Sequence, residues 1–181
     1  MVLTPISMVE ALEEPKYDLI RSFEGFEIRH YTDTIQARIA TTDSNSKAPS
    51  KGFRTIAGYI FGSNNSGQKI KMTAPVHIWR DQGVMNMAFT MPSEHNLSDL
   101  PVPINSSIQV VSVAGELTAA MKFSGFYGEK KTEKLSKKLF SMISNHNLEP
   151  IGPSILAVYD NPMTLPFLRR NEILIPLKDN F

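Results

Sequence analysis

Residues 34–61 read TIQARIATTDSNSKAPSKGFRTIAGYIF, and the hydrophobic pattern changes period within this stretch. At its start, apolar Ile35, Ala37 and Ile39 alternate with polar residues, as in a strand with one buried face. From Phe53 onward the apolar residues fall three and four positions apart, which indicates one face of an amphipathic helix. We therefore predict a strand followed by a helix in the first half of the chain.

Further runs of period two lie on both sides of this helix. Turn residues separate neighbouring runs at Glu24-Gly25 and at Asp81-Gln82-Gly83, which favours antiparallel hairpins. The runs with this alternation are 16–31 before the helix, and 72–80 and 84–91 after it. From about residue 24 onward, the two strands before the helix and the two after it predict a ββαββ unit.

The same order of elements returns in the second half of the chain. A Pro-rich connection, 91–103, is expected to be extended and semi-rigid. After it come two strands, a helix with apolar positions between Leu135 and Ile143, and two closing strands ending near Leu177. The pattern predicts an α+β fold in which pseudo-repeats of about 24–91 and 106–177 form a distorted antiparallel β-barrel flanked by two helices. We expect a single domain over 14–181, with 1–13 as an N-terminal extension.

The composition of the chain narrows the classes of function. Of 181 residues, 41% are hydrophobic and 20% charged, as in an ordinary globular domain. A net charge of +1 argues against a nucleic-acid partner, and the absence of cysteine excludes disulfides and covalent c-type haem attachment. No segment approaches the roughly 18 apolar residues of a membrane span, and the N-terminus lacks the features of a signal peptide. We expect a cytoplasmic monomer with no membrane partner.

Catalytic and metal-binding signatures are absent from the sequence. There is no nucleophile elbow, phosphate loop or dinucleotide fingerprint, so we expect no enzymatic activity. The four histidines are scattered and have no metal-site spacing. His77 shares the polar face of its strand with Trp79, and we expect it at the surface.

Five stretches of the chain, taken together, resemble the SOUL haem-binding proteins. They are Tyr17 with EIRHY at 27–31; GF at 52–53 leading to YIFGSN at 59–64; KIKMTAPV at 69–76; FSGF at 123–126; and YDNP at 159–162 running to RRNEI at 169–173. The resemblance extends from about Glu14 to Leu177. It implies a duplicated ββαββ barrel that binds haem or another tetrapyrrole, non-covalently, in a shallow apolar cleft between the first helix and the loop before the last strand.

Carried onto this sequence, the resemblance assigns the cleft to the first helix and to the loop 161–170. A tetrapyrrole could be held there by apolar burial alone, at roughly 25 cal/mol per Å². The alternative is that the helical stripe packs onto the sheet, which would leave only the helix edges and the loop for a ligand. The candidate binding residues are Phe53, Arg54, Ile56, Ala57, Ile60, Met72, Leu165 and Phe167.

His30 is the candidate metal ligand. The resemblance implies that the histidine of the EIRHY stretch is an axial ligand of haem iron, and a neutral imidazole suits that role. The alternative is a strand histidine that forms local hydrogen bonds. For Arg170 and Glu172 we expect a structural role, in which they tie the last strand to a neighbouring loop.

Two positions of the chain depart from the haem-binding pattern and leave the nature of the ligand open. Gly58 and Leu165 stand where some haem-binding members carry lysines. Haem binding as a carrier, buffer or sensor is therefore one hypothesis. The other is a domain that binds a flat apolar small molecule other than haem, similar to bacterial effector-binding domains, some relatives of which are hydrolases.

Overall fold

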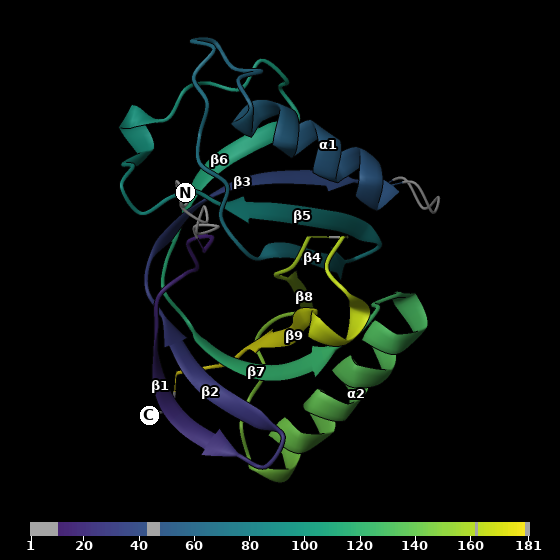
Figure 1. Ribbon diagram of the computed structural model, residues 1–181. Helices are drawn as coiled ribbons and strands as arrows, with labels where there is room; N and C mark the ends of the chain where they lie inside the picture. Colours follow the sequence, from purple (N-terminus) through teal and green to yellow (C-terminus); the bar gives the residue numbers. More distant parts are fainter. Residues whose placement is uncertain (1–10, 43–47, 162, 180–181) are drawn as a thin grey trace, which may run out of the picture.

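The computed structural model describes residues 11–42, 48–161 and 163–179. The nine strands form one sheet. Figure 1 shows that this sheet curls into a half-barrel, with one helix against each half of its outer face. The elements of the first half are β1 (Tyr17–Phe23), β2 (Phe26–Tyr31), β3 (Thr34–Thr41), α1 (Ala48–Ile60), β4 (Val76–Asp81) and β5 (Val84–Thr90). Those of the second half are β6 (Ile108–Val113), β7 (Leu117–Ser124), α2 (Glu129–Asn145), β8 (Ile155–Val158) and β9 (Arg170–Pro176), with short 3-10 helices η1 (Leu97–Asp99) and η2 (Pro166–Leu168).

The sheet joins the two halves by a reciprocal exchange of strands. The strand order is β1-β2-β7-β9-β8-β4-β5-β3-β6, and neighbouring strands are antiparallel. β2 of the first half pairs with β7, and β6 of the second half pairs with β3. Without the edge strand β1, each half is thus a ββαββ unit, related to the other about a line between β4 and β8. The predicted α+β class and duplicated unit are confirmed, with the curled sheet open between β1 and β6.

Two of the predicted turns have the backbone geometry that their residues favour. Gly25, between β1 and β2, has φ of 87°. Gln82 and Gly83, between β4 and β5, have φ of 47° and 81°, as the central residues of a type I′ hairpin require. Their tight geometry fixes which residues of each hairpin face the helices.

The convex face of the sheet carries both helices, and each helix covers its own apolar core. α1 packs on β3 and β5, where Ile56 and Ile60 lie against Ala37, Met87 and Phe89. The apolar stripe of the first helix is therefore used to bury the sheet, as the alternative interpretation of the stripe expected. Full burial of each aliphatic side chain contributes about 1.5–3 kcal/mol.

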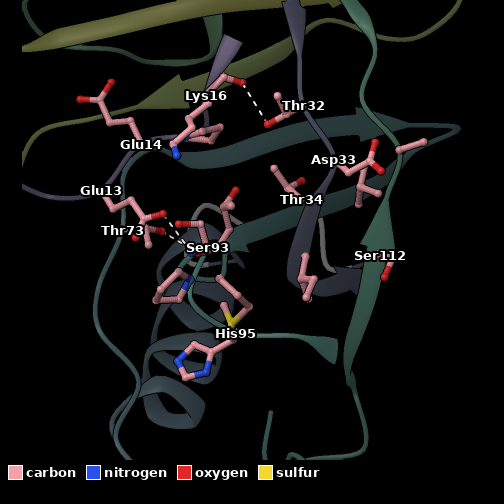
Figure 2. Close-up of a pocket in the computed structure, with 17 residues that line it drawn as sticks. Glu13, Glu14, Lys16, Thr32, Asp33, Thr34, Thr73, Ser93, His95 and Ser112 are labelled. Carbon is pink, nitrogen blue, oxygen red and sulfur yellow. Dashed lines mark hydrogen bonds between the residues drawn. The ribbon is translucent and has the colours of Figure 1, made fainter. Parts of the chain in front are cut away.

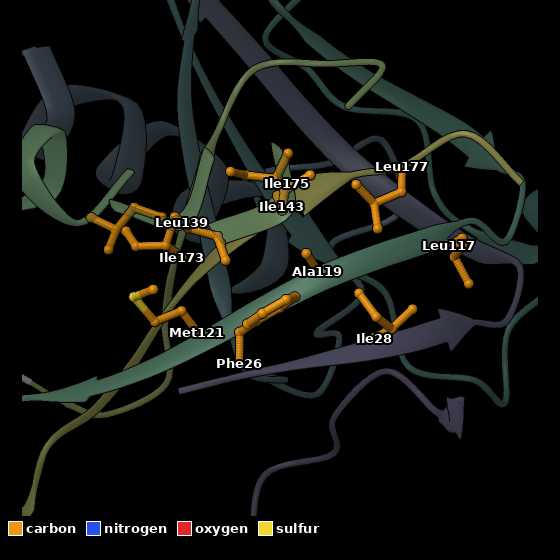
Figure 3. Packing of buried hydrophobic residues seen from close by; sticks show 11 residues of the cluster. Phe26, Ile28, Leu117, Ala119, Met121, Leu139, Ile143, Ile173, Ile175 and Leu177 are labelled. Atoms are coloured by element: carbon orange, nitrogen blue, oxygen red, sulfur yellow. The ribbon is translucent and has the colours of Figure 1, made fainter. Parts of the chain in front are cut away.

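The second core lies between α2 and the strands β2, β7 and β9. Figure 3 shows Leu139 and Ile143 of α2 facing Phe26, Ile28 and Ile173 across this core. These side chains come from segments far apart in the sequence, so the core fixes β2 of the first half to the second half.

The chain that follows α1 is held by buried polar contacts. The Asn64 side chain donates to the carbonyl oxygens of Tyr59 and Gln68 and accepts the backbone N–H groups of Ser66 and Gln68. The buried Tyr59 hydroxyl donates to Pro101 O at 2.8 Å. The Pro-rich connection is thereby attached to α1, which fits its predicted semi-rigid character.

The segment before β1 crosses from one half of the fold to the other. Glu13 O accepts the N–H of Ala74, and the Glu13 carboxylate accepts the N–H of Ser93 at 2.9 Å. Glu14 pairs with Arg170 of β9. Of the predicted extension 1–13, residues 1–10 lie outside the described part, while Glu13 is bonded to the domain.

The concave face of the sheet carries several polar and charged side chains beside a small apolar cluster around Ala120, Ala157 and Leu174. Arg29, Arg38, His77 and Glu172 all point to this side, opposite the two cores. The expectation that His77 lies at the outer surface is wrong. His77 does share the polar face of its strand with Trp79, but the sheet curls around that face, so both residues line an interior cavity.

Candidate functional site

The convex face carries a strip of half-buried aliphatic side chains between the two helices. β4 and β8 are neighbours here, while α1 packs on β3 and β5 and α2 packs on β7 and β9. The outward residues Val76, Ile78 and Val158 are only partly buried, and Ile78 packs against both cores. We call these three residues the convex strip.

The exposed edge of α1 adjoins the convex strip. Phe53 is 41% exposed, and its ring lies 5.4 Å from the ring of Phe89. Phe89 in turn pairs across the sheet with Val76 of the convex strip. Arg54, the next residue of α1, is exposed and supplies a positive charge.

The loop between β8 and β9 begins at the same end of the convex strip. Val158, the last residue of β8, pairs with Val76, and the loop follows it directly. The loop exposes an unusual number of large apolar side chains, with Phe167 at 72% exposure. Exposed apolar surface of this kind marks binding sites more often than chance. The exposed members are Met163, Leu165, Phe167 and Leu168.

Polar contacts hold the backbone of this loop. Arg169 Nε donates to Thr164 O at 2.8 Å, and the Arg170 N–H donates to the Asp160 carboxylate at 2.5 Å. The guanidinium of Arg169 also lies 4.9 Å from the ring centre of Phe126. The loop therefore presents its apolar side chains from a bonded backbone, which lowers the entropic cost of binding.

The predicted binding residues fall into two groups. One group is exposed at one end of the convex strip. It consists of Phe53 and Arg54 on the α1 edge and of Leu165 and Phe167 on the loop. The other four face the first core: Ile56, Ala57 and Ile60 are buried, and Met72 is half-buried against it.

His30 lies apart from both groups. It is half-buried on β2 beside Asp18 of β1 and Leu117 of β7. The loop meets β7 at its other end, where Ser124 pairs with Arg170. The eight residues from Leu117 to Ser124 are separated by seven steps of about 3.3 Å, so the strand spans about 23 Å. The structure therefore does not bring His30 to the loop.

The concave interior contains a buried ion pair that connects β2 to β9. The Arg29 guanidinium donates to both carboxylate oxygens of Glu172, at 2.7 and 3.1 Å, and also to Glu27 and the Tyr31 hydroxyl. Tyr159 donates its hydroxyl to Glu172 at 2.8 Å. The expected role of Glu172 is to tie the last strand to a neighbouring loop. It does tie β9 to another segment, but that segment is the strand β2 and not a loop.

Burial and charge shift the pKa values in this network. Burial alone would lower the pKa of Arg29, but its hydrogen bonds to Glu172 and Tyr31 raise that pKa above the usual range. Burial raises the pKa of Tyr31 to about 12 and that of Tyr159 still further. At neutral pH both tyrosines therefore remain protonated, and Tyr159 keeps the proton that it donates to Glu172.

A cavity of about 560 Å³ opens on the same side of the sheet, between the N-terminal segment and the ends of the strands. Figure 2 shows Glu13, Lys16, Thr32, Asp33 and His95 around it. None of its lining residues belongs to α1 or to the loop 161–169. This cavity could not be predicted from the sequence, because its walls come from polar and apolar positions on separate segments. Within the described residues, no cluster of metal-binding side chains is found.

The model of the SOUL heme-binding protein family matches residues 12–176 of this chain. Human heme-binding protein 2 is 28% identical over 171 residues, covering 86% of this chain and 82% of the human protein. The mouse protein of the same name is 30% identical over 140 residues, covering 70% of this chain and 67% of its own length.

Solved structures with the same architecture are much more distant in sequence. The C-terminal domain of EcmrR superimposes with a TM-score of 0.66 at 9% identity, covering 90% of this chain and 98% of that domain. A hydrolase from Listeria innocua gives 0.61 at 9% identity, covering 84% of this chain and 91% of the hydrolase. At this level of identity the likeness concerns the fold alone.

Proposed function

Because this chain belongs to the SOUL heme-binding protein family, we propose that it binds haem or another tetrapyrrole non-covalently at the end of its convex strip. The observation that carries the proposal is the exposed apolar surface of Phe53, Leu165 and Phe167 beside that strip. A flat macrocycle buries a large apolar area on such a surface, at roughly 25 cal/mol per Å².

The residues of this surface fit the ring of a tetrapyrrole better than its metal. Arg54 is placed to pair with a propionate, as guanidinium groups do with carboxylates. None of the four histidines belongs to the α1 edge, the loop or the convex strip. When bound, the haem would supply its own redox-active iron, and the chain would supply apolar contact and one cation. We propose a role in carrying, buffering or sensing the tetrapyrrole, without catalysis.

We further propose that the protein acts as a cytoplasmic monomer with no nucleic-acid or membrane partner. The net charge of +1 supports the proposed absence of a nucleic-acid partner. Neither α1 nor α2 combines the length and the apolar character that crossing a bilayer demands, and the described residues contain no other candidate helix.

The experiment that tests the proposed function is a haemin titration of the purified protein, followed by Soret absorbance. We expect a saturable shift at micromolar protein. A linear, unsaturable change would contradict haem binding. Titration with iron-free protoporphyrin extends the test, because binding by apolar burial should not depend on iron.

A second candidate ligand is a flat apolar molecule without propionates. Gly58 and Leu165 stand where some family members carry lysines, and this favours a ligand without propionates. Without those lysines, Arg54 beside Phe53 is the cation that the α1 edge offers to a propionate. A porphyrin whose propionates are esterified should then bind at least as well as protoporphyrin.

Replacing His30 by Ala should leave haemin binding unchanged. His30 lies at the far end of β7 from the loop, so it contributes no contact to the proposed surface. We expect the same Soret maximum and the same dissociation constant within about twofold. Loss of a low-spin spectrum in His30→Ala, with its unfolding midpoint unchanged, would instead show that His30 ligates the iron.

A further inference from the structure

A second cavity, of about 100 Å³, adjoins the cavity of Figure 2 on the concave side of the sheet. The two cavities share the lining residues Pro15, Thr32, Thr34, Val113 and Ala114, so they are neighbours. The side chains that characterise the inner cavity are Gln36 and Arg38 of β3, His77 and Trp79 of β4, and Glu116 and Thr118. We call it the inner cavity.

Arg38 is a cation of the inner cavity with unused hydrogen-bond donors. Its Nε donates to Gln36 at 2.9 Å, and the guanidinium carbon lies 5.6 Å from the ring centre of Trp79. In the part of the chain that the structure describes, its two terminal nitrogens have no hydrogen bond and no ion pair. Arg29, by contrast, is already paired with Glu172 and Glu27.

Burial leaves the charge of Arg38 poorly compensated. Desolvation lowers its pKa, and Glu116 opposes that effect from a distance without forming an ion pair among the described residues. Desolvation likewise raises the pKa of Glu116. An arriving anion would satisfy the free guanidinium donors, and Glu116 could then accept a proton. An arriving cation would meet the guanidinium, which cannot release its proton in this pH range.

The neutral walls of the inner cavity suit an aromatic ring. His77 is uncharged at neutral pH, since burial and the nearby Arg38 lower its pKa to about 4, with Glu172 opposing. Trp79 is half-buried and offers ring surface. A cavity of about 150 Å³ holds one benzene ring in another protein. The inner cavity is smaller than that, so a ring beside Trp79 would extend towards the cavity of Figure 2, with which the inner cavity shares lining residues.

We propose that the inner cavity is a binding site for a small aromatic carboxylate, whose carboxylate accepts hydrogen bonds from the terminal nitrogens of Arg38 while its ring lies beside Trp79. This site is on the concave face and is separate from the tetrapyrrole surface on the convex face. It does not depend on the function proposed above.

The single tryptophan of the chain provides a local readout, because Trp79 lines the inner cavity. Three probes of nearly equal shape distinguish the charge that the site accepts: benzoate, benzamide and benzamidine. We expect a saturable change in Trp79 fluorescence with benzoate, at a dissociation constant of about 0.1–1 mM, and at least about tenfold weaker responses with the others. A preference for benzamidine, equal responses to all three, or no saturable response to benzoate would overturn the proposal.

Matched variants test the assignment of the carboxylate partner. Arg38→Gln should weaken benzoate binding by at least about tenfold, the value of a charge-assisted hydrogen bond. Arg80→Gln changes an exposed arginine next to Trp79 on the same strand and should leave binding unchanged. Glu116→Gln removes the like charge and should tighten binding. Weaker binding in Glu116→Gln, or unchanged binding in Arg38→Gln, would contradict the role of Arg38. If Arg38→Gln fails to fold, the three-probe comparison on the unmodified protein still decides the proposal.

Haemin titration of the same variants separates this site from the convex surface. Arg38→Gln should bind haemin as the unmodified protein does, since Arg38 is on the opposite face of the sheet. Failure of benzoate to bind would leave the haemin result unaffected, and the reverse also holds.

Discussion

Replacing Glu172 by Ala is expected to lower the free energy of unfolding by about 3–5 kcal/mol, the usual cost of breaking a buried ion pair. The Arg29 side chain is 1% exposed and that of Glu172 is 2% exposed, and two hydrogen bonds join them. The substitution leaves a buried guanidinium with Glu27 as its remaining carboxylate and removes the acceptor of the Tyr159 hydroxyl. Urea unfolding measures the loss.

An exposed ion pair provides the control for this prediction. Glu133 and Lys137 lie one turn apart on α2, and both are well exposed. Glu133→Ala should change stability by no more than about 0.5 kcal/mol. The double variant Arg29→Met with Glu172→Leu should cost less than the two single changes added together, because it removes both charges. A loss below about 1 kcal/mol in Glu172→Ala would show that this ion pair does not hold β2 to β9.

The second large effect concerns the pH dependence of stability through His77. Burial and, to a smaller extent, the charge of Arg38 on β3 together lower its pKa in the folded protein to about 4, while Glu172 on β9 acts in the opposite direction. Between pH 4 and 6.5 the unfolded chain therefore binds more protons than the folded protein. The contribution of His77 is complete above pH 6.5 and is lost as the pH falls towards 4.

The size of this effect follows from the difference in pKa. At about 1.4 kcal/mol per unit, a shift from 6.5 to about 4 corresponds to roughly 3 kcal/mol. We expect the unmodified protein to lose more stability than His77→Gln when the pH is lowered from about 7 to about 4.5. Urea midpoints of the two proteins at both pH values give the measurement. Equal losses would mean that His77 titrates normally in the folded protein.

The helix and strand pattern was the most predictable part of this protein. The change of period between Ile39 and Phe53 depends on local spacing, so α1 and its neighbouring strands could be predicted without knowledge of the tertiary structure. The exchange of β2 and β6 between the halves could not be predicted from the sequence, because it depends on which strands pair with each other. Arg29 and Glu172 are 143 residues apart in sequence. Their ion pair forms only once β2, β7 and β9 are in register.

The candidate sites were predicted less completely, for a physical reason. A period-two strand shows which residues share a face but not whether that face is curled inward or exposed. The polar face that His77 shares with Trp79 therefore predicts His77 at the surface, whereas both residues line the inner cavity. On α1, one stripe cannot serve both core and ligand, and Ile56 and Ile60 belong to the core.

The claim that the tetrapyrrole binds on the convex face is tested most directly at Phe167. This side chain is 72% exposed, so a charge placed there does not disturb the core. Haemin titration of Phe167→Glu should give a dissociation constant at least about tenfold higher than that of the unmodified protein, the value of one buried aromatic contact. The urea midpoint should be unchanged. Ile104→Glu, at a position of equal exposure outside the proposed surface, is the control and should bind haemin normally. If Phe167→Glu binds haemin as tightly as the control, the loop does not form the site and the proposed surface is wrong.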